Sequence, residues 1–287
     1  RSYMSNILVT GANGQLGSEL KDFELKYPQF NFYFTNSQEL DITNHSLVRS
    51  FIIENKIEII VNCAAYTAVD KAETEYVLCN EINHLAVANF AQIAKEQNIK
   101  LVQISTDYVF DGESYKPYLE SDSTNPQSVY GTTKLAGEIA IQNIAPQNSI
   151  IIRTSWVYSS YGNNFVKTML RLGREREELS IIVDQVGTPT YAKDLAKAIL
   201  EILPQLEKKE VAIYNFSNLG VCSWYDFAKA IFESSGIKVN VAPIETSQYP
   251  TAAKRPLYSV MNKRKITEKF NITIPYWKDS LGECLKQ

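Results

Sequence analysis

The chain has 287 residues, of which 45% are hydrophobic and 21% are charged. This length and apolar content suffice for one large core or two modest ones, and the composition excludes a disordered or collagen-like chain. The formal net charge of -3 argues against a nucleic-acid partner, because phosphate binding needs a surplus of basic side chains that the chain as a whole does not have.

The predicted elements alternate between strands and helices along the first half of the chain. Short apolar runs rich in β-branched and aromatic residues predict buried strands at residues 6–10, 30–34, 58–62, 100–104 and 149–153. Stretches with helical apolar spacing are found at residues 15–26, 44–55, 76–97 and 129–142. This βαβ alternation predicts an α/β fold, a Rossmann-like doubly wound parallel sheet with helices on both faces.

The regular alternation weakens after about Trp156. Two further helices, at residues 194–203 and 224–234, and one further strand, at residues 212–216, are predicted there. We therefore expect a smaller, interleaved C-terminal domain. Its expected bounds are 156–184 and 218–287, and those of the larger domain are 4–155 and 185–217. The long polar loop at residues 111–128 predicts a functional connection.

Cysteine, histidine and apolar content narrow the classes of function further. The four cysteines contain no CxxC pair, which favours free thiols in a reducing compartment and predicts a cytoplasmic protein. The two histidines leave little material for a hydrolase triad or a histidine-rich metal site. No apolar run reaches the roughly 18 residues that a membrane span needs, so no membrane association is expected.

The predicted strand at residues 6–10 runs directly into a glycine-rich loop and then into a helix, which is the context of a phosphate-binding turn. In this interpretation Gly11 permits the tight turn, Gly14 lets the backbone approach a pyrophosphate, and Gly17 lets the helix pack closely on the sheet. Three glycines in an ordinary turn are the alternative. The strand-turn-helix context favours dinucleotide binding.

A tyrosine and a lysine lie four residues apart in the helix predicted at residues 129–142. Ser128 can cap this helix, and Tyr130 and Lys134 then project from one face. An ammonium close to a phenol stabilises phenolate and lowers the tyrosine pKa from its usual value near 10. Thr106 follows the fourth predicted strand, at the rim where such sheets bind ligands. Any helix can carry such a pair on a solvated face, but beside the glycine loop the pair predicts acid catalysis.

The sequence resembles the extended short-chain dehydrogenase/reductases and, among them, the dTDP-4-dehydrorhamnose reductase family. The resemblance spans nearly the whole chain and is carried by six segments. They are Gly-Ala-Asn-Gly-Gln-Leu-Gly at 11–17, Asp-Ile-Thr at 41–43, Asn-Cys-Ala-Ala-Tyr-Thr-Ala-Val-Asp at 62–70, Ser-Thr-Asp-Tyr-Val-Phe-Asp-Gly at 105–112, Tyr-Gly-Thr-Thr-Lys-Leu-Ala-Gly-Glu at 130–138 and Arg-Thr-Ser-Trp-Val-Tyr at 153–158.

The resemblance implies an oxidoreductase of nucleotide-sugar biosynthesis that uses NADPH or NADH to reduce the C4 keto group of a deoxysugar nucleotide, dTDP-4-dehydro-L-rhamnose. It implies that Tyr130 protonates the C4 oxygen, that Lys134 tunes Tyr130 and holds the nicotinamide ribose, and that Thr106 assists at the oxygen. The implied cofactor contacts are Gly11, Asn13, Gly14, Gln15, Leu16, Gly17, Asp41, Ile42, Ala64, Ala65, Tyr66, Tyr130 and Lys134. The implied substrate contacts are Thr106, Asp107 and Trp156. For Asp107 a turn residue, and for Trp156 a core aromatic, are the alternatives.

Two departures from related patterns decide between subclasses. Similar nucleotide-sugar dehydratases carry a glutamate directly after the Thr-Asp pair as a base for water elimination, whereas this chain has Tyr108, so a simple reductase is predicted. Some family members form a dimer bridged by magnesium through glutamates. Glu19 matches one such ligand, but Lys193 stands where another glutamate is expected. Because an ammonium cannot bind a divalent cation, we predict no metal, and a monomer or homodimer that needs none.

Two other functions fit these residues. A regulatory protein similar to the β subunit of methionine adenosyltransferase keeps the same tyrosine and lysine, and a nucleotide-sugar epimerase shares the pair and the glycine loop. Cofactor behaviour separates the three functions. A reductase exchanges its cofactor in every cycle, an epimerase tends to retain it, and a regulatory subunit binds a partner enzyme. The sequence also predicts weak discrimination between NADPH and NADH, because residues 35–37 include neither an acid for the ribose hydroxyls nor an arginine for a 2′-phosphate.

Overall fold

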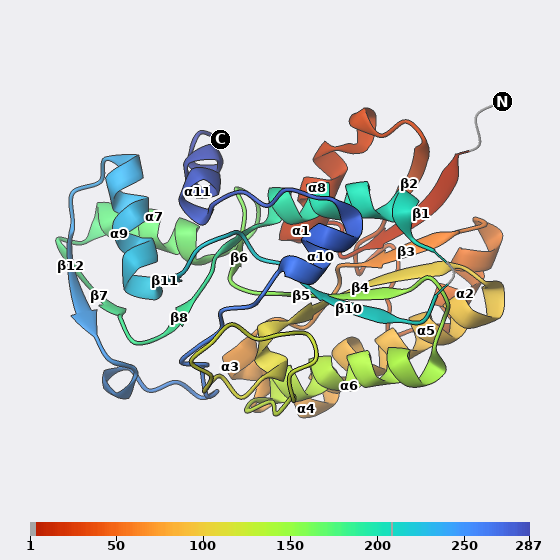
Figure 1. Cartoon of the computed structure of the whole chain (residues 1–287), viewed down its shortest axis with the longest axis horizontal. Coiled ribbons are helices and arrows are strands. Elements are labelled where there is room, and N and C mark those ends of the chain that lie inside the picture. The colour runs from red at the N-terminus through yellow and green to blue at the C-terminus, as the bar shows by residue number, and fades with distance from the viewer. Residues whose placement is uncertain (1–3, 208) are drawn as a thin grey trace.

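Six parallel strands form the central sheet of the computed structural model, which describes residues 4–207 and 209–287. Their order is β10-β5-β4-β3-β1-β2 (Figure 1). The strands are β1 (Ser5–Thr10), β2 (Phe30–Phe34), β3 (Ile59–Asn62), β4 (Lys100–Thr106), β5 (Ile150–Thr154) and β10 (Ala212–Asn215). Every strand predicted from an apolar run is present, and the predicted fold class, a doubly wound parallel α/β sheet, is confirmed.

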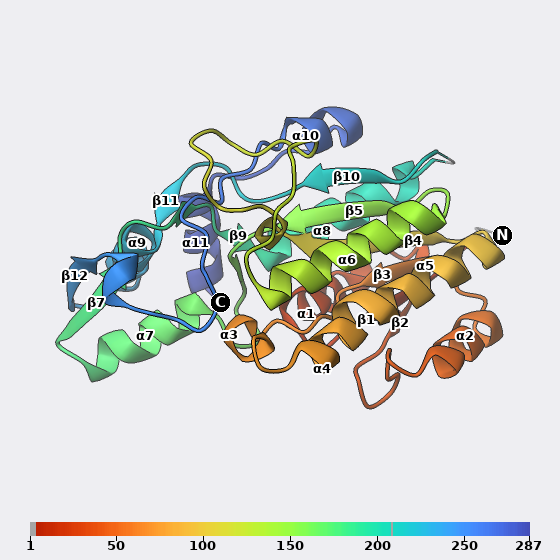
Figure 2. The same ribbon diagram turned by 90° about the horizontal axis from the view of Figure 1, so that it is seen from below.

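The alternation of side chains along the strands explains why helices cover both faces of the sheet. In β1 the side chains of Ile7 and Val9 enter one apolar cluster and that of Leu8 enters the other, because successive residues of a strand point to opposite faces. Figures 1 and 2 show the resulting helix layers. The first cluster includes residues of α1 (Gln15–Asp22), α8 (Ala192–Ile202) and α10 (Arg264–Phe270), and the second residues of α2 (His45–Glu54), α5 (Ala86–Gln97) and α6 (Val129–Ile144).

Two of the predicted helices are interrupted. The helix predicted at residues 15–26 ends at Asp22 and continues as a 3-10 turn. The helix predicted at residues 76–97 contains a π-helical stretch, a feature that is frequent at functional sites. This stretch holds Asn83, whose side-chain amide bonds both backbone groups of Tyr66. The bounds of these segments are Glu24–Lys26 for the 3-10 turn, Tyr76–Asn80 for α4 and Glu81–Leu85 for the π-helical stretch.

The remaining elements gather at one end of the sheet (Figure 1) and share a separate apolar cluster that includes Phe227 and Trp277. The helices are α7 (Phe165–Glu175), α9 (Trp224–Ser235) and α11 (Trp277–Leu285). The paired strands are β6 (Val157–Tyr158) with β9 (Thr190–Tyr191), β7 (Glu178–Ile182) with β12 (Asn240–Ile244), and β8 (Val186–Gly187) with β11 (Cys222–Ser223). Single turns lie at α3 (Val69–Ala72), Asp107–Val109, Leu203–Gln205 and Thr246–Gln248. Helix α10 comes from the segment predicted for substrate binding but packs on β10, where Phe270 meets Tyr214 edge to face.

The strand order places a switch point between β1 and β3. The helix after β1 covers one face of the sheet and the helices after β3 cover the other, so the connections diverge and leave a crevice outside the carboxyl ends of these strands. The glycine loop follows β1, and Cys63 and Ala64 follow β3. The fold thus brings both segments to the position where doubly wound sheets bind ligands. Across the described residues, no helix has both the length and the apolar character needed to cross a bilayer.

Candidate active site

A cavity of about 1060 Å³ opens at the carboxyl ends of β1, β3, β4 and β5. The predicted site residues that line it are Gly11, Asn13, Gly14, Gln15, Leu16, Asp41, Ile42, Ala64, Ala65, Thr106, Asp107, Tyr130, Lys134 and Trp156. Two predicted residues lie outside its lining. Gly17 packs beneath the loop, where a Cβ would come 2.4 Å from the Gly11 carbonyl oxygen, and Tyr66 donates its hydroxyl to Glu75.

The glycine loop passes so close to the segment after β3 that it admits no side chain. Gly11 has a φ of 62°, and a Cβ there would lie 2.7 Å from the Ala64 nitrogen. Gly14 is the N-cap of α1, and no described side chain caps this helix. Backbone N–H groups at the start of α1 are therefore available to an anion, with the helix dipole in their favour. The glycine loop, which has no side chain at its closest approach, and these backbone N–H donors fit the pyrophosphate of a dinucleotide.

The end of the cavity beside β2 has a polar wall formed by Asn36, Ser37, Gln38 and Asp41. The Asp41 carboxylate accepts the Thr43 N–H at 3.0 Å and the Thr43 hydroxyl at 2.7 Å, and these bonds hold the pKa of Asp41 below its usual value. Asp41 is thus ionised at neutral pH and engaged within its own turn. The wall contributed by residues 36–38 carries no charge of either sign.

The end of β4 meets the start of α6, and this junction brings the predicted catalytic residues together. The Thr106 hydroxyl accepts the Tyr108 N–H and donates to Asp107 Oδ1, both at 3.1 Å. Helix α6 begins with Tyr130 as its second residue. Its close approach requires Gly131, because a Cβ there would lie 2.3 Å from the Tyr108 carbonyl oxygen. The cap predicted for this helix is confirmed, since the Ser128 hydroxyl accepts the Gly131 N–H at 3.0 Å.

Burial sets the charge states of the tyrosine and the lysine. It raises the pKa of Tyr130 well above its usual value, against an opposing effect of the hydrogen bond with Thr106. It lowers the pKa of Lys134 to about 8, and the Lys134 ammonium donates to the Ile104 carbonyl oxygen at 2.6 Å. The sequence predicted a lowered pKa for Tyr130. The structure contradicts that prediction, because the loss of solvation raises the pKa of Tyr130 more than the hydrogen bond with Thr106 lowers it.

The match to known proteins covers the whole site. A family model, the RmlD substrate binding domain, matches residues 4–287. The chain belongs to this family. A dTDP-4-dehydrorhamnose reductase of Aggregatibacter actinomycetemcomitans is 40% identical over 97% of each chain. Two solved structures are similar throughout: a dTDP-4-dehydrorhamnose reductase of Clostridium acetobutylicum, 45% identical over 98% of each chain with a TM-score of 0.92, and that of Bacillus anthracis in complex with NADP, 41% identical over 99% of each chain with a TM-score of 0.94.

Among the cavity-lining residues that sequence reasoning did not assign to the site of this RmlD family chain are Trp224 and Arg255. The Arg255 guanidinium donates to the Tyr108 hydroxyl at 3.1 Å and to Asp70 Oδ2 at 2.7 Å. It places a positive charge at the cavity that Trp156 also lines. A lone arginine in a loop has no periodicity or spacing that marks it. The same holds for a tryptophan at the start of a helix, so neither could be assigned from the sequence.

A buried ion pair lies next to Lys134 on α6. Two nitrogens of Arg153, on β5, donate to the Glu138 carboxylate at 2.7 and 3.0 Å. The Arg153 side chain is 3% exposed and that of Glu138 is 1% exposed. The Ser105 hydroxyl donates to the same carboxylate. Glu138 also opposes the burial effect on the Lys134 pKa. Loss of either partner would leave an unpaired buried charge, which is strongly destabilising. The network therefore ties α6, with its predicted catalytic residues, to β4 and β5.

Glu19, which matches a magnesium ligand of some family members, is a buried carboxyl in this chain, for which no metal is predicted. Burial raises the pKa of Glu19 to about 7, with a smaller opposing effect from Lys193. Glu19 Oε2 has no hydrogen-bond partner in the described chain. Within residues 4–207 and 209–287, no group of three or more histidine, cysteine, aspartate or glutamate side chains is placed to hold a metal ion.

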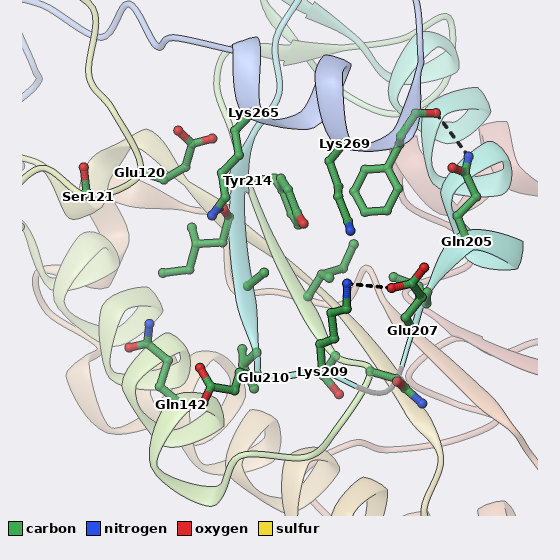
Figure 3. Close-up of a pocket in the computed structure, with 18 residues that line it drawn as sticks. Glu120, Ser121, Gln142, Gln205, Glu207, Lys209, Glu210, Tyr214, Lys265 and Lys269 are labelled. Carbon is green, nitrogen blue, oxygen red and sulfur yellow. Dashed lines mark hydrogen bonds and ion pairs between the residues drawn. The ribbon is translucent and has the colours of Figure 1, made fainter.

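A second cavity, of about 820 Å³, lies along the free edge of β10 (Figure 3). The Lys265 ammonium donates to the Ile213 carbonyl oxygen at 2.7 Å, and the Glu120 carboxylate accepts the Asn215 N–H at 3.0 Å. These side chains occupy backbone groups that an edge strand otherwise offers to another strand. As far as the chain is described, none of the predicted site residues lines this cavity. We therefore interpret it as a protected sheet edge.

Proposed function

We propose that this protein is an NAD(P)H-dependent oxidoreductase that reduces the C4 keto group of dTDP-4-dehydro-L-rhamnose to dTDP-L-rhamnose, a precursor of cell-wall and O-antigen polysaccharide. The observation that carries this proposal is the convergence of Thr106, Tyr130 and Lys134 in the cavity that also contains the glycine loop. The relatives support it, because proteins 40% and 45% identical over nearly the whole chain bear the name dTDP-4-dehydrorhamnose reductase.

The proposed cofactor is NADPH or NADH, held by the glycine loop, by Asp41 and Ile42 at the adenine end, and by Ala64 and Ala65 after β3. The NADP complex of the Bacillus anthracis relative supports a nicotinamide cofactor. Bound there, the cofactor supplies the hydride. Two of the predicted contacts, Gly17 and Tyr66, do not line the cavity. We propose that Gly17 acts by close packing and that Tyr66 acts through its bonds with Asn83 and Glu75.

The proposed proton donor is Tyr130. Its raised pKa keeps the phenol protonated at neutral pH, so its hydroxyl can protonate the C4 oxygen, and the Thr106 hydroxyl can hydrogen-bond the same oxygen. Lys134 lies one helical turn away and stabilises the phenolate that proton donation leaves. Tyr108 occupies the position of the dehydratase base. Its hydroxyl accepts a bond from Arg255 and its pKa is raised by burial, so it is unsuited to remove a proton for elimination.

The proposed substrate site faces the cofactor across the same cavity. Asp107 and Trp156 line this cavity. We assign substrate binding mainly to the segments 156–184 and 218–287, and dinucleotide binding to 4–155 and 185–217, with Asp107 reaching the substrate from the dinucleotide-binding segment. We further propose a cytoplasmic protein, because the four cysteines of the described chain are free thiols. A monomer or homodimer without metal is the proposed assembly.

The experiment that tests this function is an absorbance assay of purified protein with NADPH or NADH and dTDP-4-dehydro-L-rhamnose. We expect cofactor oxidation only when the 4-keto sugar nucleotide is present. An epimerase would retain bound cofactor without net oxidation, and a regulatory subunit would bind a partner enzyme without turnover. Absence of oxidation at saturating substrate would therefore overturn the proposal in favour of one of these two functions.

A further inference from the structure

Two tryptophans from distant parts of the chain form one wall of the cavity. Trp156 directly precedes β6, and Trp224 is the first residue of α9. Their rings stack with centroids 3.7 Å apart and planes inclined by 16°, and both line the cavity that holds Tyr130. Such close stacking contributes more than the buried area alone. The two indoles therefore act as one rigid unit.

Contacts with neighbouring residues hold Trp156 in an unfavourable backbone conformation. Its φ of 50° lies in the left-handed region, which bulky residues rarely adopt. The Thr190 N–H donates to the Trp156 carbonyl oxygen at 3.0 Å and holds this conformation. The ring rests against Gly187, where a Cβ would lie 2.9 Å from it. Backbone strain of this kind persists only where the surroundings enforce it, and it clusters at ligand sites.

Trp224 is held more firmly than a surface aromatic. The Ser223 hydroxyl and the Asp226 carboxylate form a capping box that sets the start of α9. The Trp224 indole N–H donates to Gln185 Oε1 at 3.2 Å, and Phe165 packs on the ring with centroids 4.8 Å apart. Trp224 is therefore a fixed support, against which the strained Trp156 is held.

We infer that Trp224 is a positioning residue for the sugar nucleotide: it holds the Trp156 indole at the substrate wall, and without it the substrate binds more weakly while the dinucleotide does not. This inference rests on the proposed function and adds a residue to it. Aromatic walls with few polar groups are typical of ligand sites. The glycine loop that holds the dinucleotide lies on other elements, so loss of Trp224 affects one ligand selectively.

The test compares Trp224→Ala and Trp224→Phe with the wild type. For Trp224→Ala we expect KM for dTDP-4-dehydro-L-rhamnose to rise about three- to tenfold, the range that corresponds to one aromatic pair. The dissociation constant for NADPH should stay within about twofold of the wild-type value. A change of about twofold is smaller than the effect of losing a single contact. Trp224→Phe keeps a flat ring against Trp156 and should restore most of the wild-type KM. Gly187→Ala, which displaces Trp156 from its other neighbour, should raise KM with Trp224 still present.

Trp277→Phe provides the matched control, because the third tryptophan of the chain is buried in the cluster beneath α9 and is stacked on neither partner. Near-ultraviolet circular dichroism from the coupled indoles should persist in Trp277→Phe and disappear in both Trp224 variants.

A wild-type KM in Trp224→Ala, or an equal loss of NADPH affinity, would overturn the inference. Melting temperatures of all variants separate misfolding from this outcome, and a folded Gly187→Ala with unchanged KM would also contradict it. A wild-type protein without turnover would instead overturn the proposed function itself.

Discussion

At the scale of single residues, burial decides the charge on each group that can move a proton. Tyr130 is kept neutral because its pKa is raised, and the Lys134 pKa falls to about 8. Both shifts have the same origin, since each disfavours the charged form in a site shielded from water. The tyrosine is thereby poised to give a proton, which is the direction that reduction of a ketone needs.

The residue-scale prediction that best tests the mechanism is Tyr130→Phe. The variant keeps the ring and its edge-to-face contact with Tyr108 but lacks the hydroxyl that we propose protonates the C4 oxygen. Because a positioned acid contributes 10² to 10⁴-fold, we expect kcat to fall by at least about a hundredfold, with NADPH binding and the melting temperature nearly unchanged. Lys134→Met should lower kcat and also weaken cofactor binding. Retention of more than about a tenth of the wild-type kcat in Tyr130→Phe would refute its role as proton donor.

A second prediction concerns Asp107, whose pKa burial raises to about 6 and whose Oδ2 has no partner in the described chain. The folded state therefore binds a proton more tightly than the unfolded chain, where the pKa is near 3.8. This group's contribution to stability is full at low pH and is lost as pH rises from about 4 to about 6. Asp107→Asn does not titrate. The free energy of unfolding of the wild type relative to the variant should fall by about 1 kcal/mol between about pH 5 and about pH 8. Urea denaturation at both pH values measures this difference. The same difference between wild type and variant at the two pH values would contradict the prediction.

Cofactor choice is also decided by single residues. The polar wall at residues 36–38 contains Asn36, Ser37 and Gln38, which provide neither an acid for the ribose hydroxyls nor an arginine for a 2′-phosphate. We expect the kcat/KM values for NADPH and NADH to differ by less than about a hundredfold, equivalent to about 2.7 kcal/mol. Steady-state kinetics with both cofactors checks this. A larger ratio of the two kcat/KM values would show that another group recognises the 2′ position of the ribose.

At the scale of elements, the site depends on how closely backbones approach one another. The glycine loop touches the segment after β3, and α6 touches the end of β4, each at a position where a Cβ has no room. The ion pair between Glu138 and Arg153 then ties α6 to β5. Helix α6 is thus fixed along its length, and Tyr130 and Lys134 inherit that rigidity.

Gly11→Ala tests this close approach. A Cβ at this position would meet the Ala64 nitrogen at 2.7 Å, and the φ of 62° disfavours alanine. We expect NADPH affinity to fall by at least about tenfold and the free energy of unfolding to drop by about 1 kcal/mol or more. Gly282→Ala is the matched control, because no atom lies within 4 Å of a Cβ there and alanine favours the helix by about 0.5–1 kcal/mol. Cofactor titration and denaturation of both variants decide the outcome, and equal behaviour would contradict the packing argument.

At the scale of the whole molecule, we predict a monomer or homodimer whose assembly does not depend on magnesium. Lys193 lies close enough to Glu19 to influence its pKa, which disfavours a divalent cation at that carboxylate. We expect the molar mass measured by light scattering to be the same with magnesium and with excess chelator. A dimer that dissociates in chelator would show that other carboxylates complete a metal bridge.

Much of the fold and part of the site were predictable because their signals are local. The strands follow from apolar runs such as residues 58–62, and the dinucleotide loop follows from three glycines between a strand and a helix. The pairing of Tyr130 with Lys134 follows from their spacing on one helix face. The interruptions of the helices at residues 15–26 and 76–97 were not predicted, because the apolar spacing continues through them.

The sequence by itself therefore determined the sheet, the glycine loop and the placement of Tyr130 and Lys134 on one helix, since each is encoded in the spacing of neighbouring residues. Only the tertiary structure decided the rest. It brought Trp224 against Trp156 and Arg255 against Tyr108, and it removed water from Tyr130, which reversed the expected direction of its pKa shift. Contacts between distant segments and the depth of burial depend on how the whole chain packs, and no local pattern carries that information.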